Sequence, residues 1–313
     1  MRPLMRFAVF GAGGLGGYYG ARLAQAGHAV SFVARGKQLE AMRAKGLRVL
    51  SPLGDLHLER PRVSSDPLEL GKVDCVIVAV KSWQVVEAAH AMKPLLGPDT
   101  TVLPFLNGVE APDQLAEVLG AERVLGGLSK VFAMVEAPGV IRHANAGAFV
   151  ELGELGGEPT PRARELHEAF AGAGVEAKLS ADIRGALWAK LVAVTSWAGL
   201  GALSRSAMGT LRTYPETRAL IDRAMTEGIA VGIARGHDLG RGFKDELWRF
   251  YDALPVGATA SMQRDILAGR PSELDAWNGA VVRFGAEAGL DTPVHRFTYH
   301  ALLPMERRAR GQA

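Results

Sequence analysis

The stretch FAVFGAGGLG, residues 7–16, decides the fold class of this chain. Its four apolar residues predict a buried strand, which runs directly into a G-x-G-x-x-G motif followed by a segment of helical composition. In such a motif the first glycine permits the tight turn, the second lets backbone N–H groups approach a pyrophosphate, and the third lets the helix pack close to the strand. The sequence therefore predicts a dinucleotide-binding βαβ unit. We expect cofactor contacts from Gly11, Gly13, Gly14, Leu15 and Gly16.

The end of the second predicted strand indicates which dinucleotide binds. Residues 29–34 form this strand, and it ends at Arg35 with no acidic residue before Glu40. An NAD site usually places Asp or Glu here to bind the ribose 2′-hydroxyl. A guanidinium can instead bind a 2′-phosphate through two hydrogen bonds, whereas a carboxylate would repel it. Arg35 could also be an ordinary solvated loop residue, but its position favours NADP(H) as the cofactor.

Length and composition indicate a soluble enzyme of two domains. The chain has 313 residues, of which 48% are hydrophobic and 22% charged, and its formal charge is only +3. Basic residues are scattered, so we expect no nucleic-acid partner, and Arg307–Arg310 is predicted to be a solvated tail. Uncharged stretches fall short of the ~18–20 apolar residues of a membrane span, so we expect no membrane partner.

The single cysteine, Cys75, lies in an apolar run and is predicted to be a buried core residue. No disulfide can form within the chain, which favours a reducing compartment and a cytoplasmic location. The histidines show no metal-ligand spacing, so no metal site is predicted. The sequence leaves open whether two copies form a homodimer.

The order of predicted elements indicates an α/β fold with an N-terminal Rossmann-type doubly wound parallel sheet and an all-helical C-terminal domain. Strands and helices alternate up to about residue 180, with a hairpin insertion over residues 47–60 and a meander between residues 124 and 152. Beyond that point, helical spacing is found over residues 183–203, 214–235, 243–253 and 274–288. We therefore assign residues 1–180 to an NADP-binding domain and residues 181–313 to a helical substrate and catalytic domain.

Lys190 is the candidate catalytic residue of the second domain. On a helical wheel of 100° per residue it shares an arc of about 80° with Ile183, Leu187, Val194 and Trp197. Burial within this apolar arc would lower the pKa of the ammonium group towards neutrality, as a general acid requires. The alternative is that the aliphatic stem is buried while the charge stays in water.

Four further polar residues occupy positions that are typical of ligand-binding sites. Lys81 and Asn107 each follow a predicted parallel strand, at the edge where open α/β sheets bind ligands. Glu273 and Ser261 lie at predicted helix starts, where helix-dipole and N-cap roles are the simpler explanations.

Taken together, these residues resemble the ketopantoate reductase (2-dehydropantoate 2-reductase) family over nearly the whole chain. The matching segments are the glycine motif, Val80–Gln84, Asn107-Gly108, the lysine-bearing segment Ile183–Leu191, and Ser261–Glu273. The resemblance implies a Rossmann domain followed by a helical domain. It also implies NADPH-dependent reduction of a 2-oxo acid to a 2-hydroxy acid, with ketopantoate and pantothenate biosynthesis as the default expectation.

The resemblance also implies a role for each candidate. Lys190 would polarise the keto group and protonate the alkoxide, and Glu273 would hold the lysine and the ligand. Ser261 would bind the substrate carboxylate. Lys81 and Asn107 would hold the nicotinamide end of the cofactor, with Arg35 on its 2′-phosphate.

The chain departs from the family pattern at the substrate wall. Ketopantoate-reducing members carry asparagines one and two turns after the lysine, and here these positions are Val194 and Ala198. Thr195 and Ser196 cannot easily replace them, because helix geometry turns both away from the lysine face. A more apolar 2-oxo acid is therefore the alternative substrate. A non-catalytic NADP-binding redox sensor is less favoured, because it would need neither Lys190 nor Glu273. A flavoprotein is less favoured, because Arg35 and the helical second domain indicate NADP.

Overall fold

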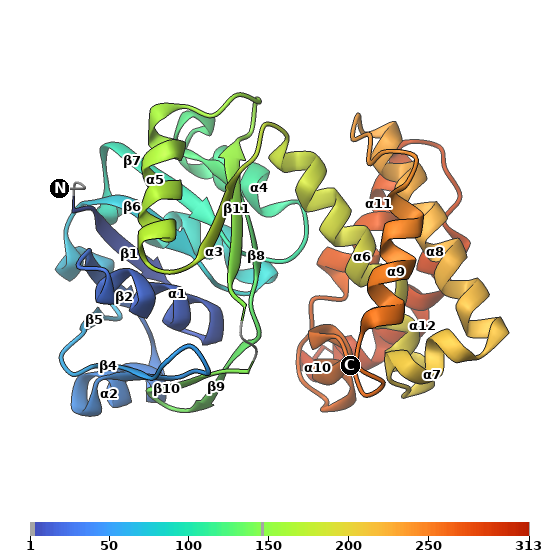
Figure 1. Ribbon diagram of the computed structural model, residues 1–313, viewed down its shortest axis with the longest axis horizontal. Helices are drawn as coiled ribbons and strands as arrows, with labels where there is room; N and C mark the ends of the chain where they lie inside the picture. Colours follow the sequence, from blue (N-terminus) through green and yellow to red (C-terminus); the bar gives the residue numbers. More distant parts are fainter. Residues whose placement is uncertain (1–3, 145–146, 313) are drawn as a thin grey trace. The chain divides into compact units, whose positions relative to one another are not determined.

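The computed structural model describes residues 4–144 and 147–312. The chain divides into two compact units, shown in Figure 1. The first, called here the sheet unit, runs up to Leu106 and resumes over Glu110–Ile183. The second, the helical unit, consists of Asn107–Val109 and the chain from Arg184 onward. The main boundary between the two units therefore lies after Ile183. The tripeptide Asn107–Val109, from the first half of the chain, also belongs to the helical unit.

The sheet unit is built on five parallel strands in the order β5-β2-β1-β6-β7. The predicted parallel doubly wound sheet is therefore confirmed. The strand order reverses between β1 and β6, and open α/β sheets bind ligands at the carboxyl ends of the strands on either side of such a point. The strands are β1 (Arg6–Phe10), β2 (Ala29–Val33), β5 (Arg62–Ser64), β6 (Val73–Val78) and β7 (Leu96–Pro104).

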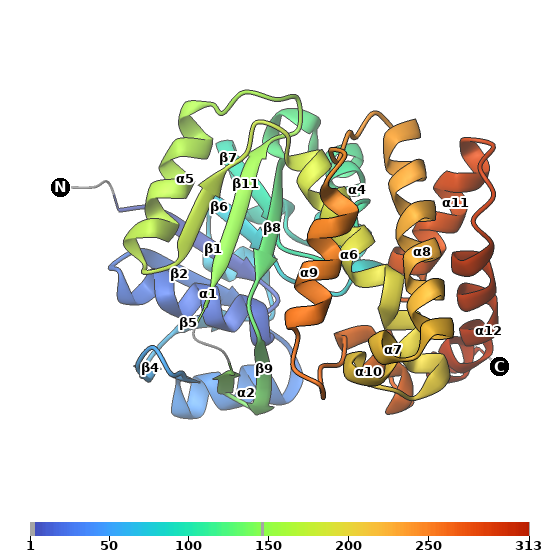
Figure 2. The same cartoon turned by 45° about the vertical axis from the view of Figure 1, so that its right-hand side comes forward.

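Both faces of this sheet are buried, which explains why its strands are continuously apolar. Successive side chains of β1 point to opposite faces, so Phe7 and Val9 enter one core cluster while Ala8 and Phe10 enter the other. Helices α1, α2 and α5 contribute to the first cluster, and α3 and α4 contribute to the second. Figure 2 shows α1, α2, α4 and α5 around the strands. The helices are α1 (Gly14–Gln25), α2 (Gly36–Lys45), α3 (Val85–Ala91), α4 (Ala111–Leu119) and α5 (Pro161–Gly172). Cys75 is fully buried in this core, as predicted, and burial raises the pKa of its thiol.

Two smaller sheets complete the unit. The predicted hairpin is confirmed as β3 (Leu47–Leu50) and β4 (Leu56–Leu58), and it continues into a sheet of order β4-β3-β10-β9. The predicted meander is wrong, because β10 pairs with β3 as well as β9, whereas β8 pairs with β11. The remaining strands are β8 (Leu125–Lys130), β9 (Ala133–Ala137), β10 (Val140–His143), β11 (Phe149–Glu154) and β12 (Glu176–Leu179). Short 3-10 turns lie at Pro67–Leu70, Ser82–Gln84, Lys93–Leu95 and Ala121–Arg123.

The helical unit surrounds α6 (Ile183–Ser204), which is apolar on almost every side. This helix is long and apolar enough to span a membrane by length and composition. However, 67% of its apolar 18-residue segment is buried inside the protein, as is typical of the core helix of a soluble fold. The other helices are α7 (Met208–Thr213), α8 (Pro215–Ala234), α9 (Phe243–Ala253), α10 (Ser261–Leu267), α11 (Ala280–Glu287) and α12 (Pro293–Ala309).

Two details of the helical unit differ from expectation. The helix expected over residues 274–288 begins with a π-helical turn, Asp275–Gly279, in which the Gly279 N–H donates to the carbonyl oxygen of Leu274. The solvated tail expected at Arg307–Arg310 is confirmed only in part, because Arg307 and Arg308 are exposed but lie on the last turn of α12, and Arg310 is partly buried. The Arg310 guanidinium donates to Glu306 and to the Ser272 carbonyl oxygen.

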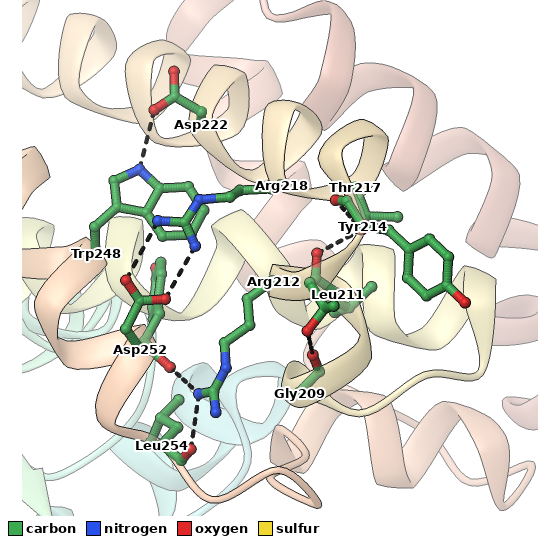
Figure 3. Close-up of polar contacts among 12 residues, drawn as sticks. Gly209, Leu211, Arg212, Tyr214, Thr217, Arg218, Asp222, Trp248, Asp252 and Leu254 are labelled. Atoms are coloured by element: carbon green, nitrogen blue, oxygen red, sulfur yellow. Dashed lines mark hydrogen bonds and ion pairs between the residues drawn. The ribbon is translucent and has the colours of Figure 1, made fainter.

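Helices α8 and α9 are joined by a stacked ion-pair cluster, shown in Figure 3. The Arg218 guanidinium lies 3.8 Å from the centroid of the Trp248 ring and donates to Asp252 over 3.0 Å. The indole N–H of Trp248 donates to Asp222 over 3.1 Å, and Lys244 donates to the same carboxylate over 2.6 Å. The attraction of the cation for the ring face adds to the ion pairs between the two helices.

Candidate functional site

The glycine loop after β1 has the backbone that close approach of a ligand requires. Gly11 adopts φ +106°, and a Cβ atom there would lie 2.6 Å from the carbonyl oxygen of Ala79, which follows β6. A Cβ at Gly16 would collide with the carbonyl oxygen of Gly11, so both glycines are required by packing. Gly13 is different, because no heavy atom lies within 4 Å of the place its Cβ would take. That open space lies at the N-cap of α1.

Two neighbours support this loop from the side. The Gln38 amide donates to the carbonyl oxygen of Ala12 over 2.9 Å and accepts from the Gly139 N–H over 2.9 Å. A Cβ at Gly14 would collide with the backbone of Ala133 on β9, so Gly14 packs against the protein. Sequence reasoning missed Gln38, because a glutamine in the first turn of a helix carries no local signal for a contact 26 positions away.

The start of α1 offers donors for a phosphate. The N–H group of Gly17 is bonded to the Gly13 carbonyl oxygen, so the N–H groups of Gly14, Leu15 and Gly16 have no partner within the helix. These donors and the positive end of the helix dipole form an anion site. The loop residues therefore fit the pyrophosphate of a dinucleotide.

Arg35 ends the turn after β2 and is the N-cap residue of α2. Its Nη1 atom donates to Glu87 Oε1 on α3 over 3.0 Å, and both side chains are more than half exposed. The exposed guanidinium can exchange this partner for another anion at little cost, because exposed ion pairs contribute only ~0–1 kcal/mol. Sequence reasoning missed Glu87, which looks like any solvated helix residue.

Lys81 lies just beyond the carboxyl end of β6, at the point where the strand order reverses. It is exposed and is the N-cap residue of the turn Ser82–Gln84, where its N–H donates to Gln84 Oε1 over 3.2 Å. Its ammonium nitrogen lies 5.9 Å from the centroid of the Trp83 ring. The structure thus places Lys81 in the same unit as the glycine loop and Arg35.

In the helical unit, Lys190 lies on the partly exposed side of α6. It shares this side with Ala189, Ala193 and Val194, whereas Leu191 and Val192 are buried. A lysine on the accessible strip of an otherwise buried helix can meet a ligand without entering the closed core.

Two candidates that are distant in sequence meet in this unit. The Asn107 side-chain amide donates from Nδ2 to Glu273 Oε2 over 3.1 Å. Glu273 is only 6% exposed, and its carbonyl oxygen accepts from the Trp277 N–H in the π-helical turn. The amide therefore supplies a hydrogen bond that a largely buried carboxylate needs.

The remaining substrate candidates occupy different environments. Ser261 is partly exposed and is the first residue of α10, whose N-cap is Ala260, so the alternative that Ser261 is the N-cap is wrong. Val194 is partly buried, and Ala198 lies wholly within the core of the unit. Thr195 and Ser196 are both buried, and the Ser196 hydroxyl donates to the Val192 carbonyl oxygen over 2.7 Å.

A buried polar cluster lies behind the π-helical turn. Asn278 Nδ2 contacts His295 Nδ1 at 3.0 Å and the Thr195 carbonyl oxygen at 3.4 Å, and His295 Nε2 contacts the Ala224 carbonyl oxygen at 3.0 Å. Burial lowers the pKa of His295 to about 4. Over residues 4–144 and 147–312, no group of three His, Cys, Asp or Glu side chains could hold a metal ion.

Comparison with known proteins agrees with this geometry. The family model "Ketopantoate reductase PanE/ApbA" matches residues 7–157, and "Ketopantoate reductase PanE/ApbA C terminal" matches residues 182–306. A 2-dehydropantoate 2-reductase of Mesorhizobium japonicum is 34% identical over 97% of this chain and 97% of its own.

Solved structures give the same result. A PanE/ApbA family ketopantoate reductase from Ralstonia eutropha JMP134 superposes with a TM-score of 0.90 at 33% identity, covering 98% of this chain and all of its own. A D-mandelate dehydrogenase solved with NADH and anilino(oxo)acetate shares the fold at a TM-score of 0.89, with 23% identity over 98% of this chain and 99% of its own. The sequence and fold matches together show that the chain belongs to the ketopantoate reductase family of nicotinamide-dependent oxidoreductases.

Proposed function

We propose that the protein reduces a 2-oxo acid to a 2-hydroxy acid with NADPH, and that ketopantoate, the substrate of pantothenate biosynthesis, is the first candidate. The observation that carries this proposal is the contact between Asn107 and Glu273, in the same unit as Lys190. It joins two segments that the family resemblance singles out independently. The names of the relatives support the reaction type.

In this proposal each residue acts on a defined atom. When bound, the cofactor supplies the hydride that reaches the keto carbon. Lys190 donates a hydrogen bond to the keto oxygen and transfers a proton to it as the alkoxide forms, so the product is the neutral hydroxyl. Glu273, fixed by Asn107, orients the lysine and the ligand, and Ser261 binds the substrate carboxylate.

Arg35 supports NADP(H) over NAD(H). Arg35 would exchange its partner Glu87 for the 2′-phosphate, while the glycine loop holds the pyrophosphate and Lys81 and Asn107 hold the nicotinamide end. We assign these cofactor contacts to the Rossmann part, residues 1–180, with the exception of Asn107, which belongs to the helical unit, and the substrate chemistry to residues 181–313. A cytoplasmic location suits a chain whose single thiol, Cys75, is buried and reduced.

The second candidate is the same reaction on a more apolar 2-oxo acid. It is favoured by the partly exposed Val194, which offers no hydrogen bond at a position where ketopantoate-reducing members carry asparagine. Ala198, at the second such position, offers none either but is fully buried. Each missing hydrogen bond to a buried polar group would cost ~1–3 kcal/mol of substrate binding.

The test is NADPH oxidation, followed by absorbance, with ketopantoate beside 2-oxo acids that carry branched or aromatic side chains. Turnover of ketopantoate with the highest kcat/KM supports the first candidate. A higher kcat/KM for an apolar 2-oxo acid supports the second, and no NADPH oxidation with any member of the panel would reject both.

A further inference from the structure

The peptide that precedes Glu273 is bound to the end of the last helix. Ser272 donates its backbone N–H to both oxygens of Glu306, over 3.1 and 3.0 Å, and its hydroxyl to Glu306 Oε2 over 2.5 Å. Arg310 donates to Glu306 Oε1 over 2.6 Å and to the Ser272 carbonyl oxygen over 3.0 Å. These three residues form a closed hydrogen-bonded ring, called here the Ser272–Glu306–Arg310 ring.

The carboxylate of this ring is buried, and its guanidinium is partly buried. Glu306 is 4% exposed, and Ser272 is not exposed at all. Burying a carboxylate costs several kcal/mol unless its oxygens are paired and hydrogen-bonded, and here both oxygens are. A fully satisfied buried network of this kind holds its members in one geometry.

The residues on both sides of Glu273 are fixed by this ring and its continuation. Ser272 is held directly, and its hydroxyl oxygen also accepts the N–H of Leu274 over 3.2 Å. Leu274 then begins the π-helical turn through its carbonyl oxygen, which accepts the Gly279 N–H. The backbone of Glu273 is therefore set from α12, while its side chain is held by Asn107.

We infer that Glu306 and Arg310 are positioning residues for the reaction, acting through Ser272 on the carboxylate of Glu273. This inference rests on the proposed function, because it assumes that Glu273 serves the chemistry. The last turn of α12 touches no reacting atom in this scheme. It sets where the Glu273 carboxylate stands.

A double-mutant cycle tests the inference. Glu306→Gln should lower kcat about tenfold in the folded enzyme, since a displacement of ~1 Å in a site can cost on the order of 100-fold. In a Glu273→Gln background the same substitution should lower kcat by less than about twofold, because the group through which it acts is already gone. An equal fall in both backgrounds would show a merely structural role and overturn the inference.

Two further variants keep the test decisive. Arg308→Ala changes an exposed arginine on the same turn of α12 and should leave kcat unchanged. If Glu306→Gln does not fold, Arg310→Ala opens the ring from its more exposed side and enters the same cycle. Full activity of folded Arg310→Ala and Glu306→Gln would also refute the positioning role.

A structural measurement separates this inference from the proposed function. If the wild-type protein reduces no 2-oxo acid, the proposed reaction fails, but a crystal structure of Glu306→Gln still reports on the ring. Displacement of residues 272–274 with loss of the Asn107–Glu273 hydrogen bond supports the positioning link. An unchanged Glu273 carboxylate would overturn it, whatever the reaction.

Discussion

Asn107 Nδ2 lies 3.1 Å from Glu273 Oε2, although the two residues are 166 positions apart in the chain. Asn107 follows the sheet strand β7, whereas Glu273 precedes the π-helical turn of the helical unit. An amide donor is suited to this position because it stabilises the ionised carboxylate without neutralising it. The same amide can also keep the carboxylate oriented while a ligand approaches.

Lys190→Ala should abolish most of the turnover without releasing the cofactor. Loss of a general acid lowers kcat by roughly 10²- to 10⁴-fold, and the glycine loop and Arg35 lie elsewhere in the chain. Stopped-flow turnover and NADPH titration measure the two properties separately. Lys190→Arg is the matched control, because it keeps the charge but cannot release a proton near neutral pH. Near-normal kcat in either variant would remove Lys190 from the mechanism.

Arg35→Ala should weaken NADPH by roughly 10- to 100-fold, the equivalent of ~1.5–3 kcal/mol for hydrogen bonds to a charged group. NADH lacks the 2′-phosphate, so its affinity should hardly change. Calorimetric titration of both cofactors measures the difference. Equal weakening of NADPH and NADH would contradict the assignment of Arg35 to the 2′-phosphate.

Glu87→Gln should act in the opposite direction. It removes the carboxylate that contacts Arg35, so NADPH should bind about two- to fivefold more tightly, in line with the ~0–1 kcal/mol of an exposed ion pair. NADH affinity should stay the same. Glu40→Gln, which changes an exposed carboxylate on α2, is the control and should alter neither. Unchanged NADPH affinity in Glu87→Gln would mean that this ion pair does not compete with the cofactor.

At Val194 and Ala198 the chain departs from the asparagines of ketopantoate-reducing members, and the two positions should respond differently to substitution by asparagine. Val194→Asn is partly exposed and should fold normally while raising kcat/KM for ketopantoate relative to apolar 2-oxo acids. Ala198→Asn would bury an amide in the core of the helical unit and should cost ~1–3 kcal/mol of unfolding free energy. Denaturant unfolding and the substrate panel check both. A Val194→Asn enzyme with an unchanged substrate preference would show that this position does not contact the substrate.

His295 makes stability dependent on pH. Its pKa falls from 6.5 to about 4 on folding, so between these values the unfolded chain binds the additional proton. The free energy of unfolding is therefore unaffected by the titration of His295 above pH 6.5. As the pH falls towards 4, it decreases by on the order of 3 kcal/mol. Burial raises the pKa of nearby Glu227, so the folded chain binds the additional proton there. Above the ordinary pKa of that carboxyl, the contribution of Glu227 to the free energy of unfolding therefore falls as the pH rises.

The comparison with His295→Gln isolates the histidine. This variant should be less stable than the wild type at pH 7, and it should lose less of its remaining stability between pH 6.5 and 4.5. Thermal unfolding at several pH values measures both curves. Parallel curves for the two proteins would show that His295 does not titrate in this range.

Local patterns in the sequence predicted the main elements of the fold but not every connection between them. The helix over residues 243–253 coincides with α9, because its apolar and polar residues alternate with helical period. The prediction of a meander was wrong because β10 pairs with β3, which lies about ninety residues away in the chain. The π-helical turn has no local signal either, since it is stabilised by contacts of Asn278 with other helices.

The same limit applies to the candidate site. Asn107 and Glu273 could each be singled out by a strand end or a helix start, but their hydrogen bond is a tertiary contact. Glu306 and Arg310 were hidden in a charged segment that resembles a solvated terminus. Only the buried backbone of Ser272, which needs a partner for its N–H, explains why a carboxylate belongs there.

The tripeptide Asn107–Val109 means that the two units cannot be separated by a single cut. The polypeptide leaves the sheet unit after Leu106, returns at Glu110 and leaves again after Ile183. A fragment that begins at Arg184 would lack Asn107, and its Glu273 would have lost that hydrogen-bond donor. To exchange one unit for that of a relative, in evolution or in the laboratory, it is therefore not enough to join the chains after Ile183. Residues 107–109 must be exchanged together with the helical unit. The chain is modular only in a restricted sense, with two modules linked at three points.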